Sequence, residues 1–522
     1  MKHRKRIAII GAGMGGLSAA AILARHCEVT VFERADGPGG KIRQIEAGGQ
    51  PVDSGPTVFT MDWALERVFE QAGARLRDHV TLVPQEVLAR HYWPDGTALD
   101  LFADIDRSAD AISDVFGPDE AARYRQFCAQ TGDVFETLRA PFMEAGAPSF
   151  LGLVSQRSPI SLLKTAPFST LWQHLTKAFG APKLRQLFGR YATYCGASPF
   201  SAPATLMLVA HVEQAGVWAL EGGMAALPRA LETVATRNGA RFVYGAQVDE
   251  IIEAGERVQG VRVSGDPPGL DGAAQQFDMV VMNGDVAALL NGSMSASLAQ
   301  RLPPAPKAAR SQSAMTWSAL AEPVGQPLSY HTVFFSTDYP AEFDAVFKAG
   351  SVPASPTVYV CAPDRASGKT PEGPERVFCL INAPANGDTH PYTEQEIATC
   401  RQRMLDQLAR CGTQLNLVPG TETVTTPETF ATLFPETGGA LYGMASHGWR
   451  ASFQRPGVRT PVKGLYLAGG SVHPGPGVPM AALSGHAAAM AAVKDFALTS
   501  RSPGADIAGG ISTPSARTAP TG

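Results

Sequence analysis

The sequence lacks the cysteine and histidine patterns that hold metal ions or disulfide frameworks. Its seven cysteines are scattered, with no CxxC pair and no Cys/His spacing typical of a metal site. An odd number of cysteines argues against a set of paired disulfides, and a reducing, cytoplasmic compartment is the simpler interpretation. We therefore predict no metal ion and no disulfide framework.

Long hydrophobic runs are also absent. No stretch reaches the roughly 18 apolar residues that a membrane-spanning helix needs. Basic residues at positions 2–6 precede a short apolar run, as in a signal peptide, but glycines at 11–16 interrupt that run. The sequence therefore predicts a protein that is soluble or lies on a membrane surface.

Acidic residues are missing from one long segment. None of the 68 residues between Glu144 and Glu213 is Asp or Glu, whereas the segment carries several basic residues. Its apolar residues recur at helical spacing between Phe168 and Tyr191. Basic amphipathic helices with aromatic residues are typical of proteins that dock on anionic membranes. The alternative is a pair of core-facing helices whose basic side is solvated.

The overall composition describes a globular protein with room for two or more domains. The chain has 522 residues, of which 44% are hydrophobic and 18% charged. The formal net charge of −4 averages over regions that differ, so it identifies no partner. We predict no nucleic-acid partner.

The stretch 6–34 carries the strongest local pattern. A buried-type strand at Ile7–Ile10 leads into Gly11-Ala-Gly13-Met-Gly-Gly16, an alanine-rich helical stretch follows, and a second strand ends at Glu33. This order is the βαβ fingerprint of dinucleotide binding. The glycines allow a tight turn, close approach to a pyrophosphate and close helix–strand packing, and the acid is spaced to hold a ribose hydroxyl.

Two further glycine loops follow this fingerprint. The first ends in Gly39-Gly40-Lys41, and the second is Asp53-Ser-Gly55-Pro56-Thr57. Such loops bring backbone amides against a cofactor, but they also occur as ordinary surface turns, so both interpretations stay open.

A third glycine-rich motif lies near the end of the chain. A short apolar strand at 465–468 precedes a run of Gly and Pro, and Pro479 stands where a helix of small residues would begin. The start of that helix would face something negative or electron-rich.

The motifs and the coarse elements predict a discontinuous arrangement. Short buried strands around 277–282 and 465–468 are typical of a nucleotide-binding domain to which the chain returns, whereas 317–320, 333–335, 357–360 and 377–381 predict a mostly antiparallel sheet. The predicted cofactor-binding domain comprises 1–75, 215–290 and 440–498. The predicted second domain comprises 76–214 and 291–439. Residues 499–522 are predicted to be a disordered tail.

The motifs together resemble the bacterial phytoene desaturase family of carotenoid desaturases. The resemblance rests on the N-terminal fingerprint, the loops at 33–41 and 53–57, and the C-terminal run Gly469-Gly470-Ser471-x-His473-Pro-Gly475-x-Gly477-x-Pro479. The segment 439–455 is similar to the hydroxyneurosporene desaturase branch of that family. The resemblance covers residues 6 to about 495.

The resemblance implies an α/β fold: a glutathione-reductase-like Rossmann FAD domain and a discontinuous substrate domain with an antiparallel sheet and a helical, membrane-facing part. It implies that the ADP half of FAD is held by Gly11, Gly13, Gly16 and Glu33, with the Val248 backbone near the adenine. The residues implied at the pyrophosphate and flavin side are Gly40, Lys41, Gly55 and Pro56. Those implied at the ribityl chain and isoalloxazine are Gly470, Ser471 and Met480.

One departure concerns the flavin contact. Many members of the wider flavoprotein superfamily carry an acid where this chain has Ser471, so a serine hydroxyl makes the contact or the contact is absent. No cysteine follows Cys411, so the FAD is expected to be non-covalent.

The resemblance also implies the reaction, desaturation of an acyclic 1-hydroxy or 1-methoxy carotenoid at C3–C4. Oxygen or a quinone is the expected electron acceptor, and the enzyme is expected on the cytoplasmic face of the inner or photosynthetic membrane. His447 is the candidate for a catalytic or hydroxyl-binding role, with a hydrogen-bonded structural histidine as the alternative. The other classes considered are a general phytoene or neurosporene desaturase, an amine or porphyrinogen oxidase, and a lipid-binding escort protein.

Overall fold

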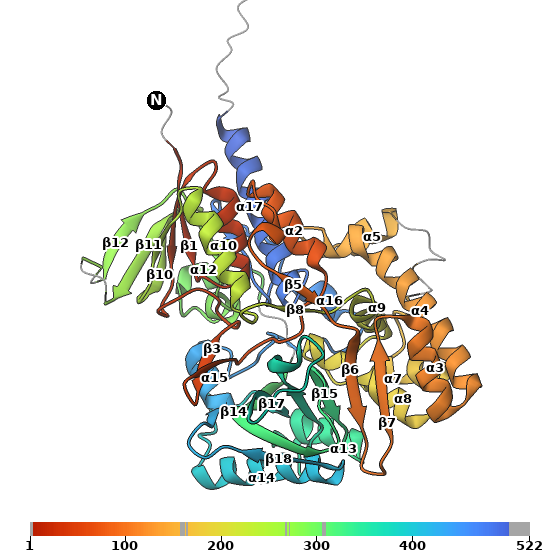
Figure 1. Ribbon diagram of the computed structural model, residues 1–522. Helices are drawn as coiled ribbons and strands as arrows, with labels where there is room; N and C mark the ends of the chain where they lie inside the picture. The colour runs from red at the N-terminus through yellow and green to blue at the C-terminus, as the bar shows by residue number, and fades with distance from the viewer. Residues whose placement is uncertain are drawn as a thin grey trace, which may run out of the picture.

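The computed structural model describes residues 4–156, 162, 165–266, 269–270, 272–304 and 309–500. A parallel sheet with its helices occupies one part of the molecule, a largely antiparallel sheet lies below it, and a group of helices lies beside both (Figure 1). Of the tail predicted to be disordered, 501–522 lies outside the described residues, and Thr499 and Ser500 end the last helix.

The parallel sheet has five strands drawn from the whole length of the chain. In spatial order they are β20 (Leu465–Leu467), β13 (Met279–Met282), β1 (Arg6–Ile10), β2 (Glu28–Phe32) and β9 (Arg241–Val243). Every neighbouring pair is parallel, and Ile7 to Ile9 at its centre are fully buried. Burial on both faces explains the continuous apolar runs from which these strands were predicted.

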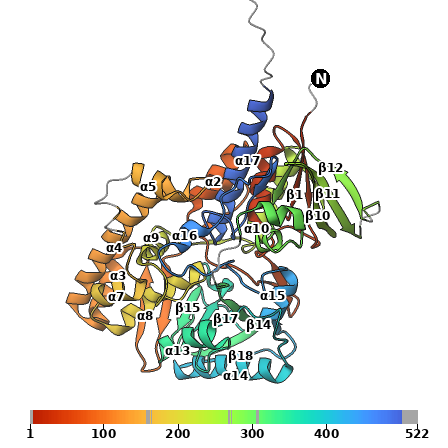
Figure 2. The same cartoon turned by 180° about the vertical axis from the view of Figure 1, so that it is seen from behind.

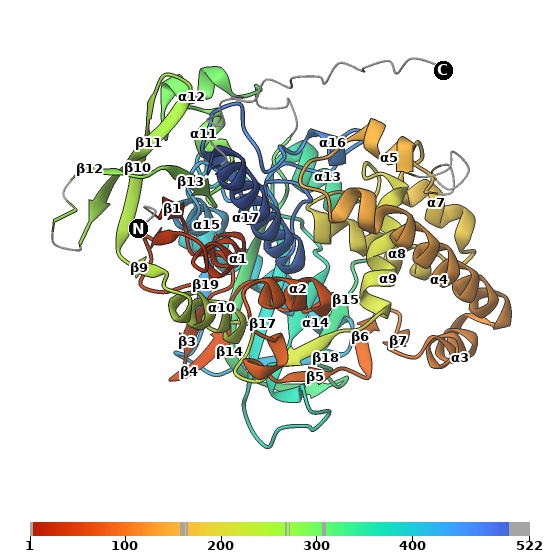
Figure 3. The ribbon, with the colours of Figure 1, turned by 90° about the horizontal axis from the view of Figure 1, so that it is seen from above.

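Three helices cover this sheet. They are α1 (Met14–Leu23), α10 (Ala226–Arg237) and α17 (Val478–Ser500). Figure 3 shows α17 beside α1, and a Cβ placed on Gly485 would lie 2.0 Å from the carbonyl oxygen of Gly15. The two helices therefore meet backbone to backbone, which small residues on both allow.

A three-stranded antiparallel sheet extends the parallel region outward (Figure 2). It consists of β10 (Ala246–Ala254), β11 (Arg257–Gly265) and β12 (Ala273–Gln276). Its first strand starts against the end of β2, where the amide of Ala246 donates to the carbonyl of Glu33 at 2.9 Å.

The second large sheet has eight strands. Along its main path they are β18 (Thr413–Leu417), β14 (Ser313–Gly325), β17 (Glu375–Ala383), β16 (Val358–Cys361), β15 (His331–Phe334), β6 (Val87–Tyr92) and β7 (Ala98–Phe102), and β19 (Thr423–Thr425) pairs with β14. All pairs are antiparallel except β15 with β6. The predicted mostly antiparallel sheet is thus confirmed, and the helix α14 (Glu394–Arg410) packs against it.

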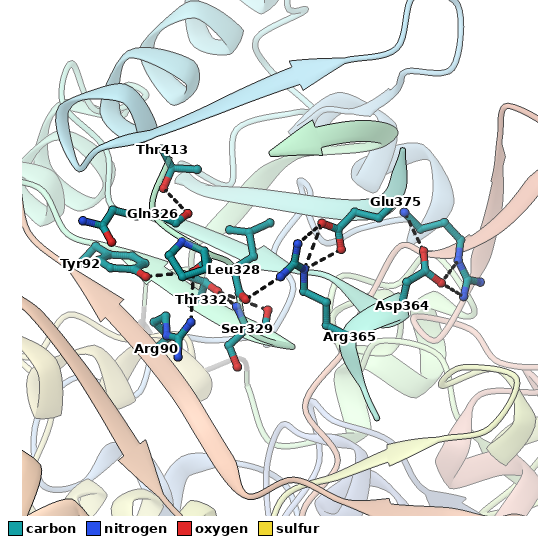
Figure 4. Close-up of polar contacts among 12 residues, drawn as sticks. Arg90, Tyr92, Gln326, Leu328, Ser329, Thr332, Asp364, Arg365, Glu375 and Thr413 are labelled. Carbon is teal, nitrogen blue, oxygen red and sulfur yellow. Dashed lines mark hydrogen bonds and ion pairs between the residues drawn. The ribbon is translucent and has the colours of Figure 1, made fainter. Parts of the chain in front are cut away.

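Ion pairs tie the loops at one end of this sheet (Figure 4). The Arg365 guanidinium meets the buried Glu375 carboxylate at 2.6 Å, and Arg376 meets Asp364 at 2.6 Å. Tyr92 donates its hydroxyl proton to the carbonyl of Pro327 at 2.9 Å. These contacts hold the connections that lead into β15 and β17.

The helical part contains the segment without acidic residues. The main helices of the helical part are α3 (Ile105–Phe116), α4 (Pro118–Leu138), α7 (Leu171–Ala178), α8 (Pro182–Gly189) and α9 (Leu208–Gln214). Of the apolar residues at helical spacing in and beside α7 and α8, Trp172 is half-buried and the others are at most 3% exposed: Leu171, Leu175, Phe179, Leu184, Leu187, Phe188 and Tyr191. For this face the core-facing alternative is the correct interpretation, because helical spacing is the same for a core and a membrane.

Two basic residues of this segment, Lys183 and Arg185, form contacts within the protein. Lys183 forms an ion pair with Asp95 and donates to Thr97 at 2.6 Å. Arg185 donates to the carbonyl oxygens of Phe179 and Gly180, each at 2.8 Å.

In the part of the chain that the structure describes, no helix is long and apolar enough to cross a membrane.

Candidate cofactor and substrate site

The turn between β1 and α1 forms an open cradle of glycines. Gly11 has φ +92°, and a Cβ on Gly16 would lie 2.1 Å from the Gly11 carbonyl oxygen, so neither position accepts a side chain. Gly13 is the N-cap of α1, and no side chain caps that helix. The amides of its first turn are therefore available to an anion.

Asn283, directly after β13, lies between the first glycine loop and the C-terminal glycine motif at this cradle. Its Nδ2 donates to the Gly11 carbonyl at 3.1 Å. A Cβ on Gly13 would lie 2.9 Å from that Nδ2, and one on Gly469 would lie 3.2 Å from Oδ1. The sequence interpretation missed this residue, although a polar side chain at the end of a buried strand was a signal.

Glu33 lies at the end of β2, against the same turn. The side chain is 9% exposed, and its two oxygens accept from the amides of Ala12 at 2.7 Å and Ala35 at 2.9 Å. Val248 lies two residues beyond Ala246, whose amide bonds to the Glu33 carbonyl, so the structure brings these two predicted residues to one edge. A register shift in the β10–β11 ladder follows Val248 directly.

The second and third glycine loops lie against the first. A Cβ on Gly40 would come within 3.2 Å of the Gly13 Cα, and one on Gly55 within 2.1 Å of the Lys41 carbonyl oxygen. The Lys41 ammonium donates to the Leu441 carbonyl at 2.6 Å, and its burial lowers its pKa. These contacts favour the interpretation of 39–41 and 53–57 as loops that line a cofactor site over that as separate surface turns. Together with the turn at 11–16 they are called the cofactor loops below.

The C-terminal motif completes this side of the site. The Ser471 hydroxyl accepts from the amide of Val286 at 3.0 Å, so it has a partner within the protein. The Arg455 guanidinium donates to the Gly470 carbonyl at 3.2 Å, and burial lowers its pKa to about 10. Met480 lies in the first turn of α17.

A cavity of about 400 Å³ begins at these loops and is lined by both the helical part and the antiparallel sheet. Gly55, Pro56 and Met480 form part of its wall at the cofactor loops. Most of the remaining wall is apolar and includes Leu138, Phe142, Leu153, Leu206, Val209 and Val212. The cavity therefore suits an apolar molecule that reaches the cofactor loops.

Two aromatic side chains mark where the cavity reaches the surface. Phe168 and Trp449 both line it and are 75% and 40% exposed, with ring centroids 5.9 Å apart. The Arg450 guanidinium lies 4.8 Å from the Trp449 ring. Phe168 is thus the exception to the buried apolar face of its segment.

A buried charged cluster interrupts the apolar wall. The Arg190 guanidinium donates to the Tyr194 hydroxyl at 2.8 Å and lies 4.0 Å from the Glu213 carboxylate, which accepts from Tyr194 at 3.2 Å. Burial raises the pKa of Glu213, whereas the Arg190 charge acts in the opposite direction. The pair is 3–8% exposed, so each charge depends on its partner.

His447 is bound outside the cavity wall. Its Nε2 accepts from the Ser198 amide at 3.0 Å, and its ring lies 4.7 Å from that of Phe347. Burial lowers its pKa. These contacts favour the interpretation of His447 as a structural histidine.

The described residues form no metal site. No group of three or more His, Cys, Asp or Glu side chains there could hold a metal ion, and all seven cysteines are free.

The family model for flavin-containing amine oxidoreductases matches residues 14–493. The chain therefore belongs to the flavin-containing amine oxidoreductase family, and its cofactor is a flavin. A solved oxidoreductase from Methanosarcina mazei matches 94% of this chain and 100% of its own with a TM-score of 0.57 and 18% identity. This likeness confirms the predicted α/β flavoprotein fold.

Two curated relatives show the particular branch. The chain is 47% identical over 519 residues to "Hydroxyneurosporene desaturase" of Rubrivivax gelatinosus, covering 98% of both. It is 30% identical to "1-hydroxycarotenoid 3,4-desaturase" of Flavobacterium sp. (strain P99-3), covering 92% of this chain and 97% of the relative. The predicted resemblance to carotenoid desaturases is thereby confirmed, and the chain is an oxidoreductase.

Proposed function

We propose that the protein desaturates an acyclic 1-hydroxy or 1-methoxy carotenoid at C3–C4, with FAD as cofactor. The observation that supports this most is the apolar cavity that begins at Gly55, Pro56 and Met480. The names of the two relatives supply the substrate class, and the cavity has the character that such a substrate needs.

FAD fits the glycine cradle of this chain. The positions that would hold its ADP half are Gly11, Gly13, Gly16, Glu33 and Val248. Those toward the pyrophosphate and flavin are Gly40, Lys41, Gly55, Pro56, Gly470, Ser471 and Met480. Binding is non-covalent in this proposal, because the last cysteine, Cys411, is buried in the antiparallel-sheet core and none follows it.

The bound flavin supplies the redox chemistry by accepting a hydride equivalent at N5. The protein contributes position and the exclusion of water. Apolar walls would hold the polyene along the cavity. The carbon next to the one that gives up the hydride would release its proton to bulk solvent, which leaves the new double bond. Positive charge developing on a polyene is delocalised, so a strong base is not required, and we assign none, His447 included.

The exposed pair Phe168 and Trp449 is the proposed contact with a membrane. Aromatic rings beside a basic residue suit the interface of an anionic bilayer, and here they border the cavity itself. An apolar substrate could then pass from lipid to cavity without crossing water. We propose a peripheral position on the cytoplasmic face, with oxygen or a quinone as electron acceptor.

The test supplies purified protein with 1-hydroxyneurosporene and, separately, with phytoene, using oxygen or a quinone as acceptor. A red shift of the polyene absorption with the hydroxylated substrate alone supports the proposal. Conversion of phytoene would identify a general desaturase, and no conversion of either despite bound flavin would favour an amine or porphyrinogen oxidase. Acid precipitation should release the flavin as FAD, whereas flavin in the pellet contradicts non-covalent binding.

A further inference from the structure

Three polar side chains form a hydrogen-bonded row at the cavity beside the cofactor loops. The Thr57 hydroxyl lies 2.7 Å from the Tyr359 hydroxyl, which lies 2.6 Å from Nδ1 of His331. Tyr359 on β16 pairs with Val333 on β15, so His331 is its diagonal neighbour on the same face of the sheet. Thr57 and Tyr359 both line the cavity, whereas His331 lies behind them and is 2% exposed.

The row has an unused hydrogen-bonding capacity. Burial lowers the pKa of His331 to about 3, so the imidazole is neutral and carries one proton. Its Nε2 is buried without a partner, and a proton there would be an unpaired donor. With the proton on Nδ1, His331 donates to Tyr359 and Tyr359 donates to Thr57. The Thr57 proton then has the neighbouring Cys361 thiol, a weak acceptor, as its partner until a ligand oxygen takes that place.

The opposite tautomer reverses every bond in the row. Tyr359 then donates to His331, Thr57 donates to Tyr359, and Thr57 offers a ligand its lone pairs. That tautomer leaves the Nε2 proton as a buried donor without a partner, so the orientation in which Thr57 donates to the ligand is favoured. An ether oxygen only accepts, and a hydroxyl does both, so the row suits both.

The position of the row fits the proposed reaction. Thr57 follows Gly55 and Pro56, which stand at the proposed flavin side. An oxygen on C1 is only two carbons from C3, so the group that binds it must lie beside the bond that reacts.

We propose that Thr57, Tyr359 and His331 form the subsite that recognises the hydroxyl or ether oxygen on C1 of the substrate. This inference rests on the proposed function and adds the residues that select its substrate. A hydrocarbon end would leave the cavity end of the row unpaired, and a site built to bind an oxygen rejects such an analogue strongly. Tyr359 and Thr57 position the substrate, and the flavin chemistry does not depend on them.

The test measures anaerobic flavin reduction by 1-hydroxyneurosporene, 1-methoxyneurosporene and neurosporene, which separates substrate Kd from reduction rate. For Tyr359→Phe we expect the Kd of both oxygenated substrates to rise about 10- to 100-fold, the range for a lost hydrogen bond that leaves a buried group unpaired. The Kd of neurosporene should stay within about twofold, because a Phe ring fills the same space. Thr57→Val, at the other end of the row, should likewise raise the Kd of the oxygenated substrates and leave that of neurosporene unchanged. Thr57→Ser, which keeps the hydroxyl, should restore the preference for oxygenated substrates.

Tyr92→Phe is the matched control, since its hydroxyl donates to the Pro327 carbonyl and neither residue lines the cavity (Figure 4). Its preference for oxygenated substrates should equal that of the wild type. The inference is overturned if Tyr359→Phe and Thr57→Val keep that preference, or if they weaken all three substrates equally. A wild-type protein that reduces its flavin with none of the three overturns the proposed function itself, and this inference with it.

Discussion

The cofactor loops and the cavity wall differ in the kind of group that we propose to hold the ligand. At the loops, the contacts that we propose with FAD come from backbone amides and from the space that missing side chains leave, as at Gly13 and Gly16. At the wall, they come from side chains on separate elements, such as Thr57 and Tyr359, which are 302 residues apart. A backbone site is therefore specified by neighbouring residues in the sequence, whereas a side-chain site depends on the complete fold.

The largest effect should come from filling the glycine cradle. We expect Gly13→Val to abolish flavin binding, because its side chain would meet Asn283 and occupy the approach to the helix N-terminus. The absorbance ratio of flavin to protein after purification measures this. Gly37→Val is the matched control, since a Cβ there meets nothing within 4 Å, and it should keep its flavin. Full flavin occupancy in Gly13→Val would mean that the cofactor lies elsewhere.

A substitution in the cavity wall should lower the stability of the protein rather than its flavin binding. Arg190→Met leaves the buried Glu213 without its counter-charge, and we expect a loss of about 3–5 kcal/mol in the free energy of unfolding. Urea denaturation measures this.

The pH dependence of this variant has a defined sign. Removing Arg190 raises further the folded-state pKa of Glu213, which burial already raises above its ordinary value of 4.5. The folded protein then holds a proton that the unfolded chain releases above that value, so stability falls as pH rises from 4.5 through the folded-state pKa. The additional change Glu213→Gln should flatten this dependence, and a deficit equal at every pH would contradict the assignment.

The smallest effect should lie at the entrance of the cavity. Replacing Phe168 and Trp449 with Ser should lower binding to anionic liposomes about tenfold, because two partly inserted rings are lost. Co-sedimentation measures this, and the flavin content should not change. Val324→Ser, which removes an apolar side chain 53% exposed on β14, is the control. Equal binding by all three proteins would remove the membrane contact from this surface.

The sequence predicted the cofactor region well because its signals are local. The apolar run at 7–10 and the glycine spacing before the alanine-rich helix each depend on residues close in the chain, and the structure has these elements. Which of the predicted cofactor residues contact FAD stays a prediction, as do the domain boundaries. Asn283 was missed because its importance comes from Gly11 and Gly469, far from it in sequence.

The cavity could not be predicted in the same way. Helical spacing at 171–191 was equally compatible with a core and a membrane, and only the packing against α4 and α9 decided for the core. His447 stood out by residue type, but its bond to Ser198 depends on a contact across 249 residues. Periodicity reports which face is apolar, and the tertiary fold determines what covers it.

The wide spread of the parallel sheet along the chain has a consequence for biosynthesis. Its edge strand β20 and the covering helix α17 leave the ribosome more than 400 residues after β1, with the whole antiparallel sheet between them. Long-range pairing of this kind is slow, and a growing chain exposes its unpaired strands to aggregation in the meantime. The proposed flavin site, which includes Gly470, Ser471 and Met480, is therefore complete only after residues 465–500 have been made, so we expect flavin loading to follow the synthesis of this late segment.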